Sequence, residues 1–225
     1  MKNLTLVIPA KNESYSLPKV LEELRNIHCQ KIIVVSKIDS ETIRSINNYK
    51  CKIVKQKING YGNALIEGIN KVTTNYLCIF NADGSFDPKY LCAMYKKAII
   101  NKCFVFASRY LRTAGSADDS LLTFIGNKIF TLMGKMLFKL KTSDILFTYI
   151  MGETYKFKKL KLQNSDFRIC VEIPIKIKFN NFKYDSIASF ERKRLGGIKK
   201  VNEFIDGFLI LSELIKKYFT HRDKK

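Results

Sequence analysis

The chain has 225 residues, of which 46% are hydrophobic, and this composition excludes an intrinsically disordered protein. It holds 40 lysines and arginines but only 20 acidic residues, which gives a net charge of +20. A charge of this size indicates a polyanionic partner, such as nucleic acid, an anionic membrane or a phosphorylated substrate.

The six cysteines form no Cys-x-x-Cys pair, and with only two histidines present a zinc site is not expected. We interpret the cysteines as small core hydrophobes of a protein in a reducing cytoplasm. The N-terminus has no basic region followed by a long apolar stretch, so no signal peptide is expected. Since no apolar run reaches about 20 residues, no membrane-spanning segment is expected either.

Short apolar runs and helical periodicities alternate over the first half of the chain. The predicted strands cover residues 4–8, 31–35, 51–54, 76–80 and 103–107. The predicted helices carry apolar residues at 17–24 and 43–46, open at 60–68, and cover 89–100, with Ser14 or Ser16 and Asp39 as N-caps. This alternation predicts an α/β protein whose sheet is mostly parallel, with right-handed crossovers.

The pattern changes after residue 110. An exposed loop is expected at 111–120, followed by a long, strongly apolar helix at 121–140. Further along, the sequence predicts an extended segment at 144–151, a helix at 170–179 and a strand at 182–190. An amphipathic helix at 201–219 and a charged tail at 221–225 end the chain.

The predicted strand 76–80 is followed by a cluster of oxygen-bearing side chains. Within seven positions the sequence places Asn81, Asp83, Ser85 and Asp87. Asp87 is expected to cap a helix that begins at Pro88. Ligands of open α/β sheets bind beyond the carboxyl ends of strands, where oxygen donors suit Mg²⁺ or Mn²⁺ escorting a phosphate. The alternative is a strand that ends in an ordinary Asx-rich turn.

Two further features lie at strand or helix ends. Gly60 and Gly62 open a predicted helix, where glycines permit close backbone approach to an anionic ligand, although an ordinary glycine turn is the alternative. Arg109 follows the strand 103–107 and is expected at the same sheet edge as Asp83. It is either a surface arginine or a guanidinium clamp on a phosphate.

A basic run surrounds Gly196 and Gly197 near the C-terminus. It contains Arg192, Lys193, Arg194, Lys199 and Lys200. Two glycines inside such a run predict a flexible loop that folds over a diphosphate. A nucleic-acid patch is the rival interpretation, but the interleaving of basic and aromatic residues typical of single-strand binding is missing. We therefore expect no nucleic-acid partner.

The helices at 121–140 and 201–219 leave two interpretations open. Residues 121–140 are more apolar than a half-buried helix needs, so the helix is either core or an interfacial helix whose lysines snorkel to lipid headgroups. The amphipathic helix at 201–219 raises the same question.

Taken in this order, these residues resemble the family 2 glycosyltransferases of the GT-A fold, especially the dolichol- and polyprenyl-phosphate sugar synthases. The resemblance covers about residues 4–200. Its motifs are the nucleotide-holding turn 7–13, the glycine motif 60–68, Asn81-Ala82-Asp83 in the Asp-x-Asp metal position, Ser108-Arg109-Tyr110 on the acceptor side, the acidic residues Asp144 and Glu172, and the closing basic glycine loop 192–200.

The chain also departs from the pattern of that family. Ser36 and Lys37 stand where two aspartates normally contact the base and ribose, and Asn81 replaces the first metal aspartate. Ile198 stands in the place of a serine in the closing loop, and residues 147–150 replace a Ser-Gly-Phe-Arg run. A non-catalytic GT-A-fold binding protein therefore stays open as an alternative.

The resemblance implies a GT-A sheet flanked by helices, with a transferase domain at 1–200 and an amphipathic helix and basic tail at 201–225. It implies an inverting, Mg²⁺- or Mn²⁺-assisted transfer of a sugar from a nucleotide-diphosphate sugar to a polyprenyl or dolichyl phosphate. The residues implied for the nucleotide sugar are Pro9, Asn12, Glu13, Gly60, Gly62, Asn81 and Asp83. The metal would be held by Asp83, Asn81 and Ser85. The phosphates and the acceptor would be held by Arg109, Arg192, Arg194 and Lys199, and the catalytic residues would be Asp83, Arg109 and Asp144.

A phosphate acceptor is already ionised at neutral pH and needs no strong base. If the acceptor is instead a saccharide hydroxyl, as in the synthesis of cell-surface polysaccharides, Asp144 is the candidate base. The charge and the two apolar helices predict a peripheral protein on the cytoplasmic face of a membrane, where a membrane-protein partner is also conceivable.

Overall fold

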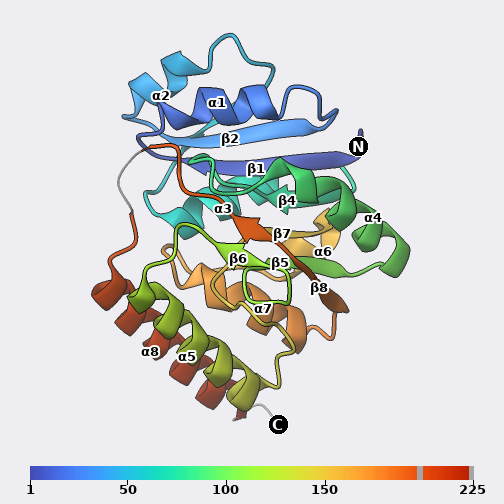
Figure 1. Cartoon of the computed structure of the whole chain (residues 1–225), viewed down its shortest axis with the longest axis vertical. Helices are drawn as coiled ribbons and strands as arrows, with labels where there is room; N and C mark the ends of the chain where they lie inside the picture. Colours follow the sequence, from blue (N-terminus) through green and yellow to red (C-terminus); the bar gives the residue numbers. More distant parts are fainter. Residues whose placement is uncertain (197–199, 223–225) are drawn as a thin grey trace.

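The computed structural model describes residues 1–196 and 200–222 of the chain. Its strands are β1 (Leu4–Ala10), β2 (Gln30–Ser36), β3 (Lys52–Gln56), β4 (Tyr76–Ile79), β5 (Phe104–Ser108), β6 (Gly115–Ser116), β7 (Ile150–Glu153), β8 (Tyr184–Ala188) and β9 (Phe190–Glu191). Seven of them form one sheet in the order β3-β2-β1-β4-β7-β5-β8, and β6 pairs with β9 in a small separate sheet (Figure 1). All the pairings are parallel except those of β7, which confirms the predicted mostly parallel α/β fold.

Helices cover both faces of the large sheet. The helices of the chain are α1 (Ser16–Glu23), α2 (Ser40–Ser45), α3 (Tyr61–Lys71), α4 (Leu91–Asn101), α5 (Leu121–Phe138), α6 (Thr154–Lys159), α7 (Ile169–Phe179) and α8 (Glu203–Arg222), with a 3₁₀ turn at Pro88–Tyr90 before α4. Of these, α5 and α8 pack on one of the helices that cover the sheet, α7. The helices predicted at 89–100, 121–140, 170–179 and 201–219 correspond to α4, α5, α7 and α8.

Alternate side chains of each strand enter two different apolar layers. Leu6 of β1 and Cys78 of β4 pack with α1 and α4 on one face. Val7 of β1 and Ile79 of β4 pack with α3 and α7 on the other. Because both faces are covered, the central strands β4 and β5 are almost wholly apolar, which is why the sequence shows them as continuous apolar runs.

The segment 144–151 is the main difference from the sequence prediction. It is extended only from Ile150 onward, where β7 runs antiparallel between β4 and β5. Before that point Ile145 packs against α5 and α7, whereas Phe147 and Tyr149 join the layer of α1 and α4. The apolar pattern therefore reflects burial on two sides of an irregular segment, and α6 directly after β7 was not predicted.

Two of the expected helix caps are confirmed and one is wrong. The carboxylate of Asp39 accepts a hydrogen bond from Thr42 N at 3.2 Å, and that of Asp87 accepts one from Lys89 N at 3.0 Å. In contrast, α1 has no side-chain cap, because the hydroxyl of Ser16 donates to the carboxylate of Glu13.

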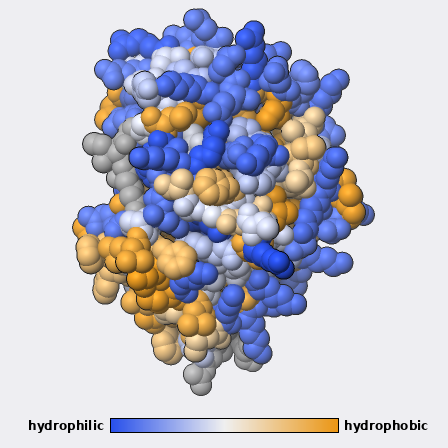
Figure 2. All heavy atoms as spheres, in the orientation of Figure 1, coloured by the Kyte–Doolittle hydropathy of each residue, from blue (hydrophilic) through white to orange (hydrophobic). Residues whose placement is uncertain are grey.

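Helices α5 and α8 lie side by side below the sheet in Figure 1. Their later turns pack on each other and on α7 through Phe138, Val171, Ile210 and Leu214. Their outward faces are apolar and exposed, and these side chains gather in one region of the surface in Figure 2.

By length and composition, one helix of the described chain is long and apolar enough to cross a membrane: α5, with 22% of its 18-residue window buried. No membrane-spanning segment was expected from the sequence. A core helix of a soluble protein can meet the same criteria, but this one is mostly uncovered.

Candidate active site

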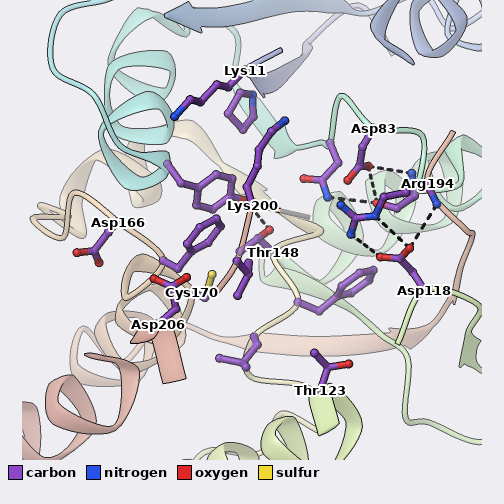
Figure 3. A pocket seen from close by; sticks show the side chains of 18 of the residues that line it. Lys11, Asp83, Asp118, Thr123, Thr148, Asp166, Cys170, Arg194, Lys200 and Asp206 are labelled. Atoms are coloured by element: carbon purple, nitrogen blue, oxygen red, sulfur yellow. Dashed lines mark hydrogen bonds and ion pairs between the residues drawn. The ribbon is translucent and has the colours of Figure 1, made fainter. Parts of the chain in front are cut away.

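A cavity of about 640 Å³ lies at the carboxyl edge of the sheet, between the ends of the parallel strands β1 and β4. After β1 the chain continues to β2 on one side of the sheet, and after β4 it continues to β5 on the other side. This is the place at which open α/β sheets bind ligands. One end is lined by strand ends and the turns after them, including Pro9, Lys11, Ser36, Asn81 and Asp83 (Figure 3). The other end reaches the first turns of α5 and α8.

The turn after β4 holds the predicted metal residues together. Oδ1 of Asp83 accepts hydrogen bonds from Ser85 N at 3.0 Å and from Ser85 Oγ at 2.7 Å. Nδ2 of Asn81 donates to the same hydroxyl at 3.3 Å. Gly84 has a φ of +83°, which lets the chain turn back sharply. The turn thus presents one carboxylate, one amide and one hydroxyl to the cavity.

This donor set fits a hard cation that is held partly by its substrate. In the described part of the chain, no group of three or more histidine, cysteine or acidic side chains could enclose a metal ion. Mg²⁺ in nucleotide sites is usually bound by one or two carboxylates, with phosphates and water completing its shell. Asp83, with Asn81 and Ser85 beside it, matches such a partial site.

The turn after β1 is fixed by residues of α2. Asn12 has a φ of +55°, and its backbone N donates to Oδ2 of Asp39 at 2.6 Å. The backbone N of Glu13 donates to Thr42 Oγ1 at 2.9 Å. Pro9 and Glu13 line the cavity, whereas Asn12 is not among the lining residues. Asp39 was predicted only as a helix cap, and its second bond across to residue 12 had no signal in the sequence.

The two glycines before and in α3 are needed by the protein's own backbone. A Cβ at Gly60 would lie 2.2 Å from Ser165 O, and one at Gly62 would lie 2.1 Å from Asn164 O. Ser165 O also accepts the hydrogen bond from Asn63 N at the start of the helix. Gly60 still lines the cavity, but Gly62 does not.

Glu172, which the resemblance marked as acidic, holds this crossing loop in place. Its buried carboxylate accepts hydrogen bonds from Gln163 N and Asn164 N at 3.1 and 2.9 Å. Burial alone would raise the pKa of Glu172, but Lys176 and these N–H groups bring it below its ordinary value. The carboxylate therefore acts on the loop that covers α3, outside the cavity lining.

Arg109 lies on the same sheet edge as Asp83, as expected, and is enclosed by three carboxylates. Its Nε and Nη2 donate to the two oxygens of Asp144 at 2.8 and 3.0 Å, in a bidentate pair. Its Nη1 donates to Asp119 and to Glu191, each at 3.1 Å. Asp144 is 0% exposed and also accepts a hydrogen bond from Asn127 Nδ2 at 2.8 Å.

The protonation of this cluster follows from its burial. Burial acts to lower the pKa of Arg109, but Asp144 and its hydrogen bonds outweigh that effect and hold the pKa well above its usual value. Burial raises the pKa of Glu191, against the opposing attraction of Arg109. Arg109 is a permanent cation here, and its donors already serve the loop 111–120, the segment around Asp144 and β9.

The first residues of the predicted closing loop, Arg192 to Leu195, are hydrogen-bonded to the turn that carries Asp83. We call these residues the closing segment. Leu195 N donates to Asp83 O at 2.8 Å, and Arg192 N donates to Ser85 O at 2.9 Å. The guanidinium of Arg192 donates to Gly84 O at 3.0 Å and Phe86 O at 3.1 Å. Arg192 is therefore absent from the lining of the cavity, and its side chain positions the turn.

Arg194 and Lys200 are the basic residues of the predicted closing loop that line the cavity. Arg194 pairs with Asp118 at 2.5 Å and lies between Asp118 and Asp83 in Figure 3. Its pKa is raised, mainly by the hydrogen bond to Asp118. Lys200 pairs with Glu13, which also lines the cavity. Lys199 lies outside the described residues.

Sequence reasoning missed several lining residues. Asp118 belongs to a loop that was expected to be exposed, although two adjacent aspartates there were a visible signal. Tyr61 stacks on Phe167 with ring centroids 4.9 Å apart, and its hydroxyl is 2.8 Å from Thr148 Oγ1. The residues from α5 and α8 were considered only as core or membrane contacts, because nothing in a helical pattern shows which side faces a cavity.

Comparisons with known proteins agree with this geometry. The sequence model of the family described as Glycosyl transferase family 2 matches residues 5–161. Uncharacterised glycosyltransferases of Mycobacterium bovis and Mycobacterium tuberculosis are each 29% identical over 99 residues, which is 42% of this chain. The chain spans 45% of the length of these curated relatives.

Solved structures share the fold at low sequence identity. A glucosyl-3-phosphoglycerate synthase from Mycobacterium tuberculosis, in complex with Mn²⁺, UDP-glucose and phosphoglyceric acid, has a TM-score of 0.75 at 12% identity. That match covers 96% of this chain and 80% of the synthase. A mannosyl-3-phosphoglycerate synthase from Rubrobacter xylanophilus has a TM-score of 0.73 at 9% identity, over 99% of this chain and 75% of its own.

The sheet order, the cavity at its carboxyl edge and the family match over most of the chain lead to one assignment: this protein belongs to glycosyl transferase family 2 and has the GT-A fold.

Proposed function

We propose that this chain transfers a sugar from a nucleotide-diphosphate sugar to the phosphate of a polyprenyl or dolichyl lipid, with the help of Mg²⁺ or Mn²⁺. The observation that carries the proposal is the course of the cavity. It begins at the turn of Asp83 and ends between two helices whose outer faces are apolar and exposed. A soluble acceptor would not account for the exposed apolar side chains of those faces.

The donor end of the cavity suits a nucleotide diphosphate with its cation. Asp83, Asn81 and Ser85 would hold the ion, which when bound neutralises charge on the leaving diphosphate. Lys11, Arg194 and Lys200 bring further positive charge to the same walls. The glucosyl-3-phosphoglycerate synthase of the same fold supports this part, since it was solved once with Mn²⁺ and UDP-glucose and once with Mg²⁺ and UDP.

The acceptor end favours a nucleophile that is already ionised. An oxygen of the lipid phosphate would attack the anomeric carbon, and the bond from that carbon to the diphosphate would break with inversion. No proton has to be removed from a phosphate at neutral pH. A saccharide hydroxyl would need a base, but both oxygens of the candidate Asp144 are bound by Arg109. We therefore rank the saccharide acceptor second.

The binding of the acceptor phosphate is assigned to Arg194 and Lys200. Among the described residues, Arg194 pairs with Asp118 and Lys200 pairs with Glu13, and both basic residues line the cavity, whereas Arg109 serves three carboxylates. A role of Arg109 on phosphate stays a prediction from the sequence, and the structure gives it a positioning role first.

Mass spectrometry of lipid extracts would test the proposed activity. The full chain is incubated with a panel of nucleotide sugars, Mg²⁺ or Mn²⁺, and a polyprenyl phosphate, with parallel samples containing phosphoglycerate or an oligosaccharide. A new glycolipid phosphate is the expected product. A product in only one of the parallel samples would show that the acceptor in that sample, and not the lipid, is the substrate. Binding of a nucleotide sugar without any product would indicate a non-catalytic protein.

The same helices support a position at the membrane surface. Exposed apolar side chains form a continuous set on α5 and α8: Leu121, Leu122, Phe124, Ile125, Ile129, Leu132 and Met136, and Phe204, Ile205, Phe208, Ile215 and Phe219. Lys128 and Lys135 stand among them on α5, Lys139 follows at its C-terminal end, and the chain carries a charge of +20. A peripheral location on the cytoplasmic leaflet combines apolar burial with attraction to anionic lipid.

Sedimentation with liposomes is expected to show both contributions. Binding to anionic liposomes should weaken at high salt without vanishing, because each lysine or arginine near the surface adds about 1 kcal/mol that salt screens. Phe208 of α8 is 72% exposed, and the Phe208→Ser variant should bind liposomes more weakly by about 2 kcal/mol. Ile100→Ser on α4 is the matched control, since Ile100 is 77% exposed but lies outside the set. Protein that stays in the supernatant with anionic liposomes at low salt would contradict the membrane location.

A further inference from the structure

The part of the cavity between α5 and α8 differs in character from the rest. We call it the helix arm. It is lined by Leu122, Gly126 and Phe130 of α5 and by Gly207 and Ile210 of α8, with Val201 just before α8 and the polar Thr123 and Asn127 beside them on α5. These positions recur every three or four residues, so one face of each helix turns toward the cavity while the neighbouring face is exposed.

Gly126 and Gly207 keep the helix arm open. An added Cβ would meet no atom within 4 Å at either position. By contrast, a Cβ at Gly134, later in α5, would lie 2.6 Å from Ile145. Glycine inside a helix costs about 1 kcal/mol relative to alanine, and neither Gly126 nor Gly207 repays that cost by close packing. Empty space beside two glycines on neighbouring helices is what a ligand passing between them requires.

The acidic residues of the helix arm limit what that ligand can be. Glu203 and Asp206 line the arm in the first turn of α8, where the helix dipole favours carboxylates. A second phosphate would be repelled there, so the headgroup belongs at the end with Arg194 and Lys200. An uncharged, flexible hydrocarbon fits the apolar part of the lining, which is formed by Leu122, Phe130, Val201 and Ile210.

From this we infer that the helix arm is the channel for the hydrocarbon chain of the lipid acceptor, and that Gly126 and Gly207 set which chains it admits. The inference rests on the proposed function and adds a site and a specificity to it. The exposed apolar set on α5 and α8 shares Leu122 with the arm, so a chain would leave the arm into the bilayer without crossing water. The phosphate would meanwhile stay near Asp83.

The expected consequence is a selectivity between acceptors of different chain length. The assay compares kcat/KM for a long-chain polyprenyl phosphate with kcat/KM for geranyl phosphate, both in detergent. In Gly126→Leu and Gly207→Leu the ratio of the first to the second should fall by about tenfold or more, since blocking an apolar site by a few carbons commonly has such an effect. Gly126→Ala should lower the ratio less than Gly126→Leu.

The design separates this effect from folding and from membrane binding. Both substitutions raise helix propensity, and both acceptors are measured with the same enzyme, so partial unfolding would not change the ratio. Met136→Ala is the control, because Met136 is 73% exposed on α5 but lies outside the arm, so the variant should weaken liposome binding without changing the selectivity in detergent.

Three results are decisive. A fall of the ratio in the leucine variants alone supports the channel. An unchanged ratio in both leucine variants, with a wild-type protein that glycosylates both acceptors, overturns the channel and leaves the proposed function intact. A wild-type protein that glycosylates neither acceptor overturns both.

Discussion

Replacing Asp83 by alanine is expected to lower kcat/KM for sugar transfer by about a thousandfold or more. Asp83 provides the carboxylate of the turn that lines the donor end of the cavity. Without it, the ion on the diphosphate would be left with the neutral Asn81 and Ser85, and charge on the leaving group would be poorly neutralised. Steady-state kinetics over a range of Mg²⁺ and Mn²⁺ concentrations measures the effect.

Asp87→Ala is the matched control for this experiment. Asp87 lies on the same turn, but it caps the following 3₁₀ turn through Lys89 N and does not line the cavity. It should cost about 1 kcal/mol of stability as a lost cap and leave transfer nearly unchanged. Asn81→Asp is expected to tighten metal binding. Full transfer in the presence of a chelator, or by the Asp83→Ala enzyme, would refute the metal role.

Replacing Arg109 by methionine is expected to lower the free energy of unfolding by about 3–5 kcal/mol. The substitution would leave Asp144, which is 0% exposed, facing Asp119 and Glu191 with no cation between them. Urea unfolding at neutral pH measures the loss. Arg109→Lys should restore little of it, because an ammonium cannot reproduce the bidentate pair with Asp144.

Arg168→Met is the control for this prediction. Arg168 also pairs with an aspartate, Asp166, but the two side chains are 29% and 30% exposed, and the loss should stay at or below about 1 kcal/mol. The pH dependence gives a second check. Burial already raises the pKa of Glu191, and loss of Arg109 removes the attraction that opposes burial. The variant should therefore recover stability as the pH falls through the raised pKa, because the folded state then binds more protons than the unfolded state.

The fold could be predicted from the sequence because its signals are local. Buried parallel strands are apolar on both faces, so β1, β2, β4 and β5 were visible as runs, and Asp39 and Asp87 marked helix starts. The antiparallel β7 was not visible in this way. Whether an apolar segment pairs as a strand or packs irregularly, as 144–149 does, depends on neighbours that are distant in the sequence.

The site could be predicted in part for the same reason. Asn81, Asp83 and Ser85 lie within one turn, so their proximity followed from spacing. The partners of Arg109 lie at residues 119, 144 and 191, and no local pattern announces that one arginine serves all three. Similarly, the glycines at 60 and 62 indicated that another group approaches the backbone closely at these positions. That group is the loop 164–166, about a hundred residues later.

The hydrogen bonds of the closing segment to the turn of Asp83 have a thermodynamic consequence. Further along the chain, Lys200 pairs with Glu13, and α8, one of the helices proposed to lie at the membrane surface, begins at Glu203. If lodging α8 in a bilayer alters how the segment holds the turn, lipid binding changes donor affinity. Linkage then requires that a bound donor change the affinity for the bilayer by the same factor. Donor concentration would thus regulate how much of this protein occupies the membrane.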